Sequence, residues 1–145
     1  MAQVEKTVLV SHSAEEMFGL VDAVEHYPEF LPWCSGTELK LRDDKTTVAT
    51  LQINYHHVKQ QFTTQNTKQF PTFMDIKLVE GPFHSLEGLW RFIPLSEDAC
   101  KIEFKLNYEF SGYLLEKLIA PVFSHIANTF VDAFVERAEK VLTQK

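Results

Sequence analysis

From about residue 112 to residue 143, apolar side chains recur at the spacing of an α-helix and form a stripe wider than a coiled-coil seam. A continuous helix of this length would be about 45 Å long at 1.5 Å per residue. Its broad apolar face needs a partner, and this requirement limits the possible folds more than any other feature. Pro121 lies inside the segment, so we expect a kink, or a short helix followed by a longer one that starts near residue 121. The apolar positions are Leu115, Leu118, Ile119, Val122, Phe123, Ile126, Ala127, Phe130, Val131, Phe134 and Ala138.

The partner that the sequence offers is a β-sheet, because apolar and polar residues alternate from about residue 35 to residue 110. Residues 49–55 and 101–106 show this period of two clearly. Turn signals such as Gly81-Pro82 separate the runs. The pattern predicts six antiparallel strands joined by short turns, apolar on one face and polar on the other. Residues 3–10 predict one more strand before them.

Two short helices are expected between the first strand and this meander. Ser13 can cap the first helix, and Glu16, three residues later, completes a capping box. The second helical or turn segment lies between about residues 24 and 31, and Pro28 and Pro32 keep it short.

These elements predict an α+β fold in which a curved antiparallel sheet of six to seven strands wraps around the long C-terminal helix. The length of 145 residues fits a single domain over residues 1–145. A curved sheet that meets one helix leaves space between the two. The sequence therefore predicts a pocket lined by aromatic residues.

Composition excludes several classes of function. The chain has 20 acidic and 14 basic residues and a net charge of −6, so we expect no broad basic surface and no binding of DNA. Its two cysteines, Cys34 and Cys100, make neither a disulfide framework nor a zinc site. No signal peptide or long apolar run is evident, and we expect a cytoplasmic protein with reduced thiols. A local basic face on the central hairpins stays open; it would consist of Lys40, Arg42, Lys45, Lys59 and Lys68.

Three segments resemble the hallmark segments of one family and occur in the same order, within a resemblance that covers about residues 3–142. They are Tyr27-Pro28-Glu29-Phe30-Leu31-Pro32-Trp33-Cys34; Glu80-Gly81-Pro82-Phe83 followed by Leu86, Gly88, Trp90 and Phe92; and Val122-Phe123 with Ala133-Phe134 and Arg137-Ala138. The chain thereby resembles the coenzyme-Q-binding and ribosome association toxin family. That family belongs to the START-like superfamily, which has a helix-grip fold.

The resemblance implies a role in binding hydrophobic molecules. One branch of the family is a mitochondrial coenzyme-Q-binding protein that supports respiration. The other is a bacterial ribosome association toxin that binds the large subunit and blocks its joining with the small one. Many bacterial members are also described as polyketide cyclase-like. The chain starts directly at its first strand, so we expect a bacterial member.

From this resemblance we expect a carrier or chaperone for ubiquinone or another polyprenyl quinone that supports respiratory electron transport. The alternatives are a protein that binds the large ribosomal subunit and a cyclase-like enzyme. Transient peripheral contact with the inner membrane also stays open. The expected ligand-binding residues are Tyr55, Phe62, Met74, Ile76, Trp90, Phe92, Phe104, Tyr108, Phe123, Ile126 and Phe130, and the expected pocket rim is Phe30, Trp33 and Phe83.

Most of these residues would also serve as ordinary core, and the Tyr27–Cys34 segment would also serve as a rigid connector. Tyr55 or Tyr108 is the expected hydrogen-bond donor to a quinone carbonyl, because a buried phenol needs a partner.

Neither a metal site nor a catalytic set of residues is expected. His56 and His57 are neighbours in the chain, and adjacent side chains on a strand point to opposite faces. We expect a binding protein without a cofactor and without catalytic activity. The polar candidates for catalysis match no arrangement of nucleophile, base and orienting group; they are Tyr55, Tyr108, His84, Glu87 and Cys34.

Overall fold

The computed structural model describes residues 2–142, which contain one antiparallel sheet of seven strands. The strands lie in the order β1-β7-β6-β5-β4-β3-β2, so β2 to β7 form a meander and β1 pairs with β7. The antiparallel meander that the alternation in the sequence predicted is therefore confirmed. The strands are β1 (Ala2–Val10), β2 (Cys34–Arg42), β3 (Thr46–Tyr55), β4 (Val58–Gln69), β5 (Phe73–Glu80), β6 (Phe83–Ser96) and β7 (Ala99–Phe110).

Two helical segments separate β1 from β2, as predicted. The helix α1 (Ala14–Asp22) begins at the expected capping box. The backbone N–H of Glu16 donates to the Ser13 hydroxyl, and the backbone N–H of Ser13 donates to the Glu16 carboxylate. The 3-10 helix η1 (Val24–Glu29) follows it.

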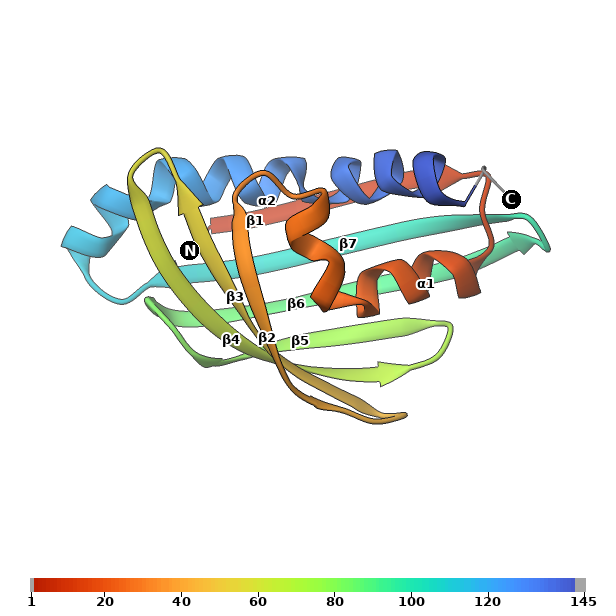
Figure 1. The fold of residues 1–145 in the computed structure, drawn as a ribbon, viewed down its shortest axis with the longest axis horizontal. Coiled ribbons are helices and arrows are strands. Elements are labelled where there is room, and N and C mark those ends of the chain that lie inside the picture. Colours follow the sequence, from red (N-terminus) through yellow and green to blue (C-terminus); the bar gives the residue numbers. More distant parts are fainter. Residues whose placement is uncertain (1, 143–145) are drawn as a thin grey trace.

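The long helix α2 (Tyr113–Val141) runs along the molecule, and the sheet curves around it (Figure 1). Its buried side chains, such as Ile119, Phe123 and Phe134, belong to the core that the sheet covers. By length and composition alone α2 would also suffice to cross a membrane. The α+β fold with a curved sheet around one long helix is confirmed.

Of the two alternatives predicted at Pro121, the division into a short and a longer helix is wrong. One helix runs from Tyr113 to Val141 with Pro121 inside it. A proline has no N–H, so the carbonyl of Lys117, four residues earlier, loses its helical partner. Both residues are exposed, and solvent can therefore bind that carbonyl while the helix continues. Leu118 was expected on the buried stripe but is 68% exposed.

Strand β2 departs from the predicted alternation. Lys40 has no partner between the pairs Leu39–Ala49 and Leu41–Val48, so the strand bulges there. Leu39 and Leu41 were expected to follow the apolar alternation, but they are 40% and 47% exposed. A bulge bends and twists its strand, and β2 is an edge strand, where bulges are common. Register shifts in the β4–β5 and β6–β7 pairs have the same effect and contribute to the curvature of the sheet.

A buried ion pair ties the end of α1 to the sheet. Lys68 Nζ on β4 lies 3.0 Å from Asp22 Oδ2, and the Lys68 side chain is only 5% exposed. The hydroxyl of Thr47 on β3 donates to Asp22 Oδ1 over 2.7 Å. Arg42 donates to the Asp22 backbone carbonyl and to Glu25, and this contact lowers the pKa of Glu25 to about 2. The network holds the start of η1 over the sheet.

Candidate functional site

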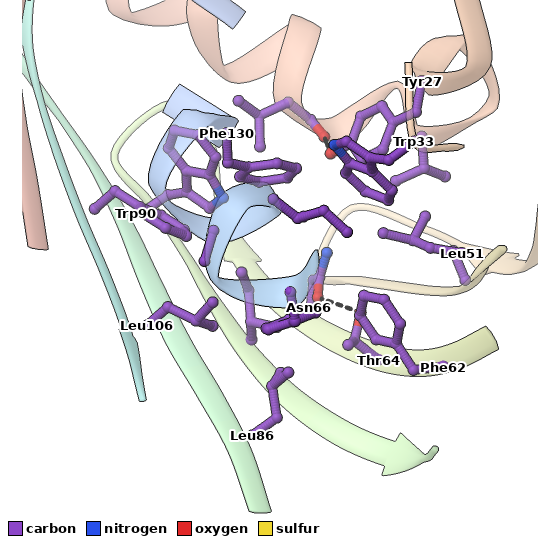
Figure 2. Close-up of a pocket in the computed structure, with 18 residues that line it drawn as sticks. Tyr27, Trp33, Leu51, Phe62, Thr64, Asn66, Leu86, Trp90, Leu106 and Phe130 are labelled. Carbon is purple, nitrogen blue, oxygen red and sulfur yellow. Dashed lines mark hydrogen bonds between the residues drawn. The ribbon is translucent and has the colours of Figure 1, made fainter. Parts of the chain in front are cut away.

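An apolar cavity lies between α2, η1 and the concave face of the sheet (Figure 2). Its volume is about 70 Å³. Strands β3 and β4 supply one part of its wall. Side chains two residues apart point to the same face of a strand. This explains why Ala49 and Leu51 line the cavity from β3, and why Phe62, Thr64 and Asn66 line it from β4.

Strands β5, β6 and β7 supply the rest of the sheet wall. Trp90 is the largest of these side chains and is 1% exposed. Its ring lies 4.6 Å from the Phe104 ring on the neighbouring strand. Gly88 lies two residues before Trp90 on β6 and pairs with Leu106 in the register, and a Cβ there would come within 2.9 Å of the Lys105 carbonyl oxygen. Glycine therefore permits the close approach of β6 and β7 behind the cavity. The lining residues from these strands are Ile76, Leu86, Trp90, Phe104 and Leu106.

One face of α2 supplies the opposite wall. Phe123, Ile126, Ala127 and Phe130 are spaced by three or four residues, so they lie on one side of the helix. The ring of Phe130 lies 5.8 Å from that of Trp90 and 6.2 Å from that of Trp33. Phe130 thus connects the sheet wall to the segment that follows η1.

The segment around η1 covers a third side. Val24, Tyr27 and Trp33 line the cavity from this segment. The Tyr27 hydroxyl donates to the backbone carbonyl of Val21, at the end of α1. On the outer side, Arg137 of α2 donates to Glu29 over 2.7 Å. Side-chain contacts thus fasten η1 both to α1 and to α2.

The structure brings together some of the predicted site residues and separates others. Phe62, Ile76, Trp90, Phe104, Phe123, Ile126 and Phe130 line the cavity, and so does Trp33, which was expected at the rim. The six that do not are Tyr55, Met74, Phe92, Tyr108, Phe30 and Phe83. A ligand role for the first group stays a prediction.

Each residue outside the lining has another packing role. The ring of Tyr55 stacks on that of His125 at 5.7 Å, near the β3–β4 turn. Phe83 and Tyr108 both pack against Phe123, at ring distances of 4.9 Å and 4.7 Å. Phe92 packs against Phe18 and Trp90, Met74 lies beside Asn66, and Phe30 lies beneath the Arg137 guanidinium.

Sequence reasoning missed the two polar residues of the sheet wall. Thr64 follows Phe62 by two residues in the sequence and Asn66 follows by two more, so alternation puts all three on one face of the strand. The signal that could have identified them is therefore the period of two on this strand. Further lining residues that were not predicted are Val21, Val24, Tyr27, Ala49, Leu51, Leu86, Leu106 and Ala127.

Tyr27 is the titratable side chain among the described residues that line the cavity. Burial raises the pKa of Tyr27 far above its ordinary value, so its hydroxyl stays protonated near neutral pH. Its proton is donated to a backbone carbonyl. Burial also raises the pKa of the Cys34 thiol, which disfavours a reactive thiolate. His84 and Glu87 are exposed on the outer side of β6. These candidates therefore do not converge on the cavity as a catalytic set.

The predicted basic residues do not make a continuous basic face. Lys68 is buried in its ion pair with Asp22, and Arg42 is paired with Glu25. Lys40, Lys45 and Lys59 are exposed. Among residues 2–142, no group of three or more histidine, cysteine or acidic side chains is arranged to hold a metal ion. His56 and His57 form the β3–β4 turn with positive φ angles of 47° and 67°.

Comparison with known proteins adds a family and two kinds of relative. A family model described as "Polyketide cyclase / dehydrase and lipid transport" matches residues 10–135. The chain is 40% identical over 141 residues to the ribosome association toxin RatA of Vibrio cholerae serotype O1, covering 97% of this chain and 98% of that protein. It is 26% identical over 144 residues to the mitochondrial coenzyme Q-binding protein COQ10 of Drosophila melanogaster, covering 97% of this chain and 56% of that protein.

The fold is shared with solved structures of distant sequence. The Zhui aromatase/cyclase from a Streptomyces species superposes with a TM-score of 0.79 over 97% of this chain and 95% of its own. The two sequences are 16% identical, so the similarity is one of fold. The two sequence relatives are named as a toxin and as a binding protein.

Proposed function

Since this chain belongs to the polyketide cyclase / dehydrase and lipid transport family of START-like proteins, in the branch that includes RatA and COQ10, we propose that it binds a hydrophobic small molecule between α2 and the sheet. The observation that carries the proposal is the cavity, whose lining is mostly apolar; its polar side-chain groups are those of Thr64, Asn66, the Tyr27 hydroxyl and the two indole N–H groups. Apolar ligand surface moved from water into such a site favours binding by roughly 25 cal/mol per Å².

A polyprenyl quinone is the first candidate ligand. The relative COQ10 is named for binding coenzyme Q, and its similarity covers 97% of this chain. A quinone combines an apolar ring and tail with carbonyl oxygens, which suits an apolar cavity that contains a few polar groups. The corresponding role is that of a carrier or chaperone in respiratory electron transport.

The size of the cavity determines how such a ligand would bind. A cavity of about 150 Å³ lined by apolar side chains is known to hold benzene, and ordinary ligand pockets are larger still. The cavity here has about 70 Å³, so a substituted quinone ring needs α2 and η1 to move apart. The isoprenoid tail would remain along the opening rather than inside. We therefore propose that ligand binding is coupled to displacement of η1.

Solvent extraction of protein purified from its native host without detergent tests this proposal. Mass spectrometry of the extract should find a quinone with an isoprenoid tail in near-stoichiometric amount. If the extract is empty, a titration of the protein with a short-tailed ubiquinone analogue should still show saturable binding. An empty extract together with no saturable binding would refute the quinone assignment.

A second candidate function is association with the large ribosomal subunit. The observation that favours it is the 40% identity to RatA over nearly the full length of both chains, against 26% to COQ10. Salt-driven contact with ribosomal RNA does not fit the net charge of −6 or the pairing of Lys68 and Arg42. Contact with ribosomal protein requires no such basic face.

The ribosome candidate is tested by sedimentation of lysates after overexpression. Free subunits should accumulate at the expense of joined ribosomes. The informative control is a variant with a filled cavity, Ala49→Val. If Ala49→Val still shifts the profile, ribosome association is independent of the ligand site. An unchanged profile with the natural chain would argue against this candidate.

A further inference from the structure

Two polar side chains of β4 interrupt the apolar lining of the cavity. Thr64 and Asn66 are each 8% exposed, and both lie on the face of the strand that lines the cavity. In the register, Thr64 pairs with Ala49 of β3, and Asn66 pairs with Ile76 of β5. Their polar atoms therefore lie in the middle of the sheet wall, among apolar neighbours.

The hydrogen bonds of Asn66 leave its amide nitrogen poorly satisfied. The Thr64 hydroxyl donates to Asn66 Oδ1 over 3.2 Å. The Asn66 amide nitrogen donates one N–H to the sulfur of Met74 over 3.7 Å, and a thioether is a weak acceptor. Among residues 2–142, the Met74 sulfur is the acceptor that this nitrogen contacts. Figure 2 shows this nitrogen on the side of Asn66 away from Thr64, facing the part of the cavity where Trp33 and Leu51 lie.

Other buried polar side chains of the same strands have strong partners. Thr47 and Lys68 bond to the Asp22 carboxylate over 2.7 Å and 3.0 Å. Thr50 and Thr63 bond to each other over 2.6 Å. Burying an amide donor without a good acceptor costs free energy, and an apolar residue of the same shape would avoid that cost. Asn66 therefore contributes less to stability than an apolar residue of the same shape would. The other buried polar groups described on these strands have strong hydrogen-bond partners.

We infer that Asn66 is the specificity-determining contact of the cavity and donates a hydrogen bond to a carbonyl oxygen of the ligand. The Thr64 hydroxyl acts as a positioning group, because its bond to Oδ1 turns the amide nitrogen toward the cavity. The inference rests on the proposed function and narrows it. The ligand class is an apolar molecule with a carbonyl oxygen, which enters the cavity with that oxygen toward β4.

The test uses two probes of nearly the same planar shape, acetophenone and α-methylstyrene, which differ in having an oxygen or a methylene group. Binding of each is measured by two-dimensional NMR titration of the natural chain and of the double variant Thr64→Val/Asn66→Leu. Each replacement preserves the shape of the side chain, and removing both partners together leaves no orphaned hydroxyl. For each protein, the dissociation constant of one probe is divided by that of the other. The greater hydrophobicity of α-methylstyrene affects both ratios equally, so it cancels when the natural chain and the double variant are compared.

In the natural chain, the preference for acetophenone relative to α-methylstyrene should be about three- to tenfold greater than in the double variant, the value of one buried hydrogen bond. The side-chain amide protons of Asn66 should shift with acetophenone and stay in place with α-methylstyrene. An equal ratio in both proteins would overturn the role of Asn66 while leaving the cavity as a ligand site. Failure of both probes to bind the natural chain would instead overturn the proposed function itself.

Discussion

Replacing Asp22 by alanine is expected to lower the free energy of unfolding by about 3–5 kcal/mol, the usual cost of leaving one member of a buried ion pair alone. The Lys68 side chain is 5% exposed, and Asp22 is the carboxylate that faces it. Thr47 loses its acceptor in the same variant. Because domains of this kind are stable by only about 5–15 kcal/mol, the change is a large fraction of the total. Urea unfolding at neutral pH measures it.

Two controls separate the lost ion pair from a general effect of the substitution. In the double variant Asp22→Asn/Lys68→Met the buried charge is absent and Thr47 keeps an acceptor. This variant should recover most of the lost stability. Asp132→Ala, on the exposed face of α2, should change the free energy of unfolding by less than about 0.5 kcal/mol. A loss below about 1 kcal/mol in Asp22→Ala would mean that solvent reaches Lys68 and that the ion pair does not hold η1 in place.

Replacing Ala49 by valine is expected to weaken binding of any ligand in the cavity by about five- to 150-fold, since overpacking costs about 1–3 kcal/mol. Ala49 is 3% exposed and lines the cavity from the interior strand β3. Valine adds two methyl groups on this wall, and its branched side chain suits a strand. The melting temperature should stay the same or rise, because these groups fill space within a cavity of about 70 Å³. Binding and melting are measured on the same samples.

A substitution that enlarges the cavity provides a complementary test. Leu51→Ala enlarges the same wall and should tighten binding of a bulky ligand while lowering the free energy of unfolding by about 2–5 kcal/mol. Gln52→Val lies on the same strand but is exposed, and it should leave ligand affinity unchanged. If Ala49→Val binds as tightly as the natural chain, the ligand does not occupy this cavity.

Local features of the sequence were sufficient for the type and order of the helices and strands, but not for the continuity of α2 through Pro121. The capping box at Ser13 and Glu16 forms as predicted, because both hydrogen bonds join residues three apart. The turns at His56-His57 and Gly81 also lie where the alternation breaks. Gly81 has a φ angle of 153°, and a Cβ there would come within 2.7 Å of the Phe62 Cβ. A glycine at a position that requires such a backbone conformation is a reliable signal of a turn in a sequence.

The candidate site was predicted only in part. Trp90 and Phe130 were assigned to the pocket, and they line it. Tyr55 and Tyr108 were assigned to it because they are polar at one end and fall on the apolar face, yet neither lines the cavity; their rings pack against His125 and Phe123 instead. Alternation gives the face on which a side chain lies. It does not give the position along the strand at which α2 and the sheet are far enough apart to leave a cavity.

The sequence by itself determined the kind and order of the elements, because the period of the apolar pattern depends only on local backbone geometry. The tertiary structure decided which polar residues became buried. The curvature of the sheet, its bulges and the course of α2 brought Lys68 against Asp22 and placed Asn66 in the cavity wall. These contacts join residues far apart in the chain, and their geometry depends on how the whole sheet twists around the helix. No short stretch of sequence contains that information.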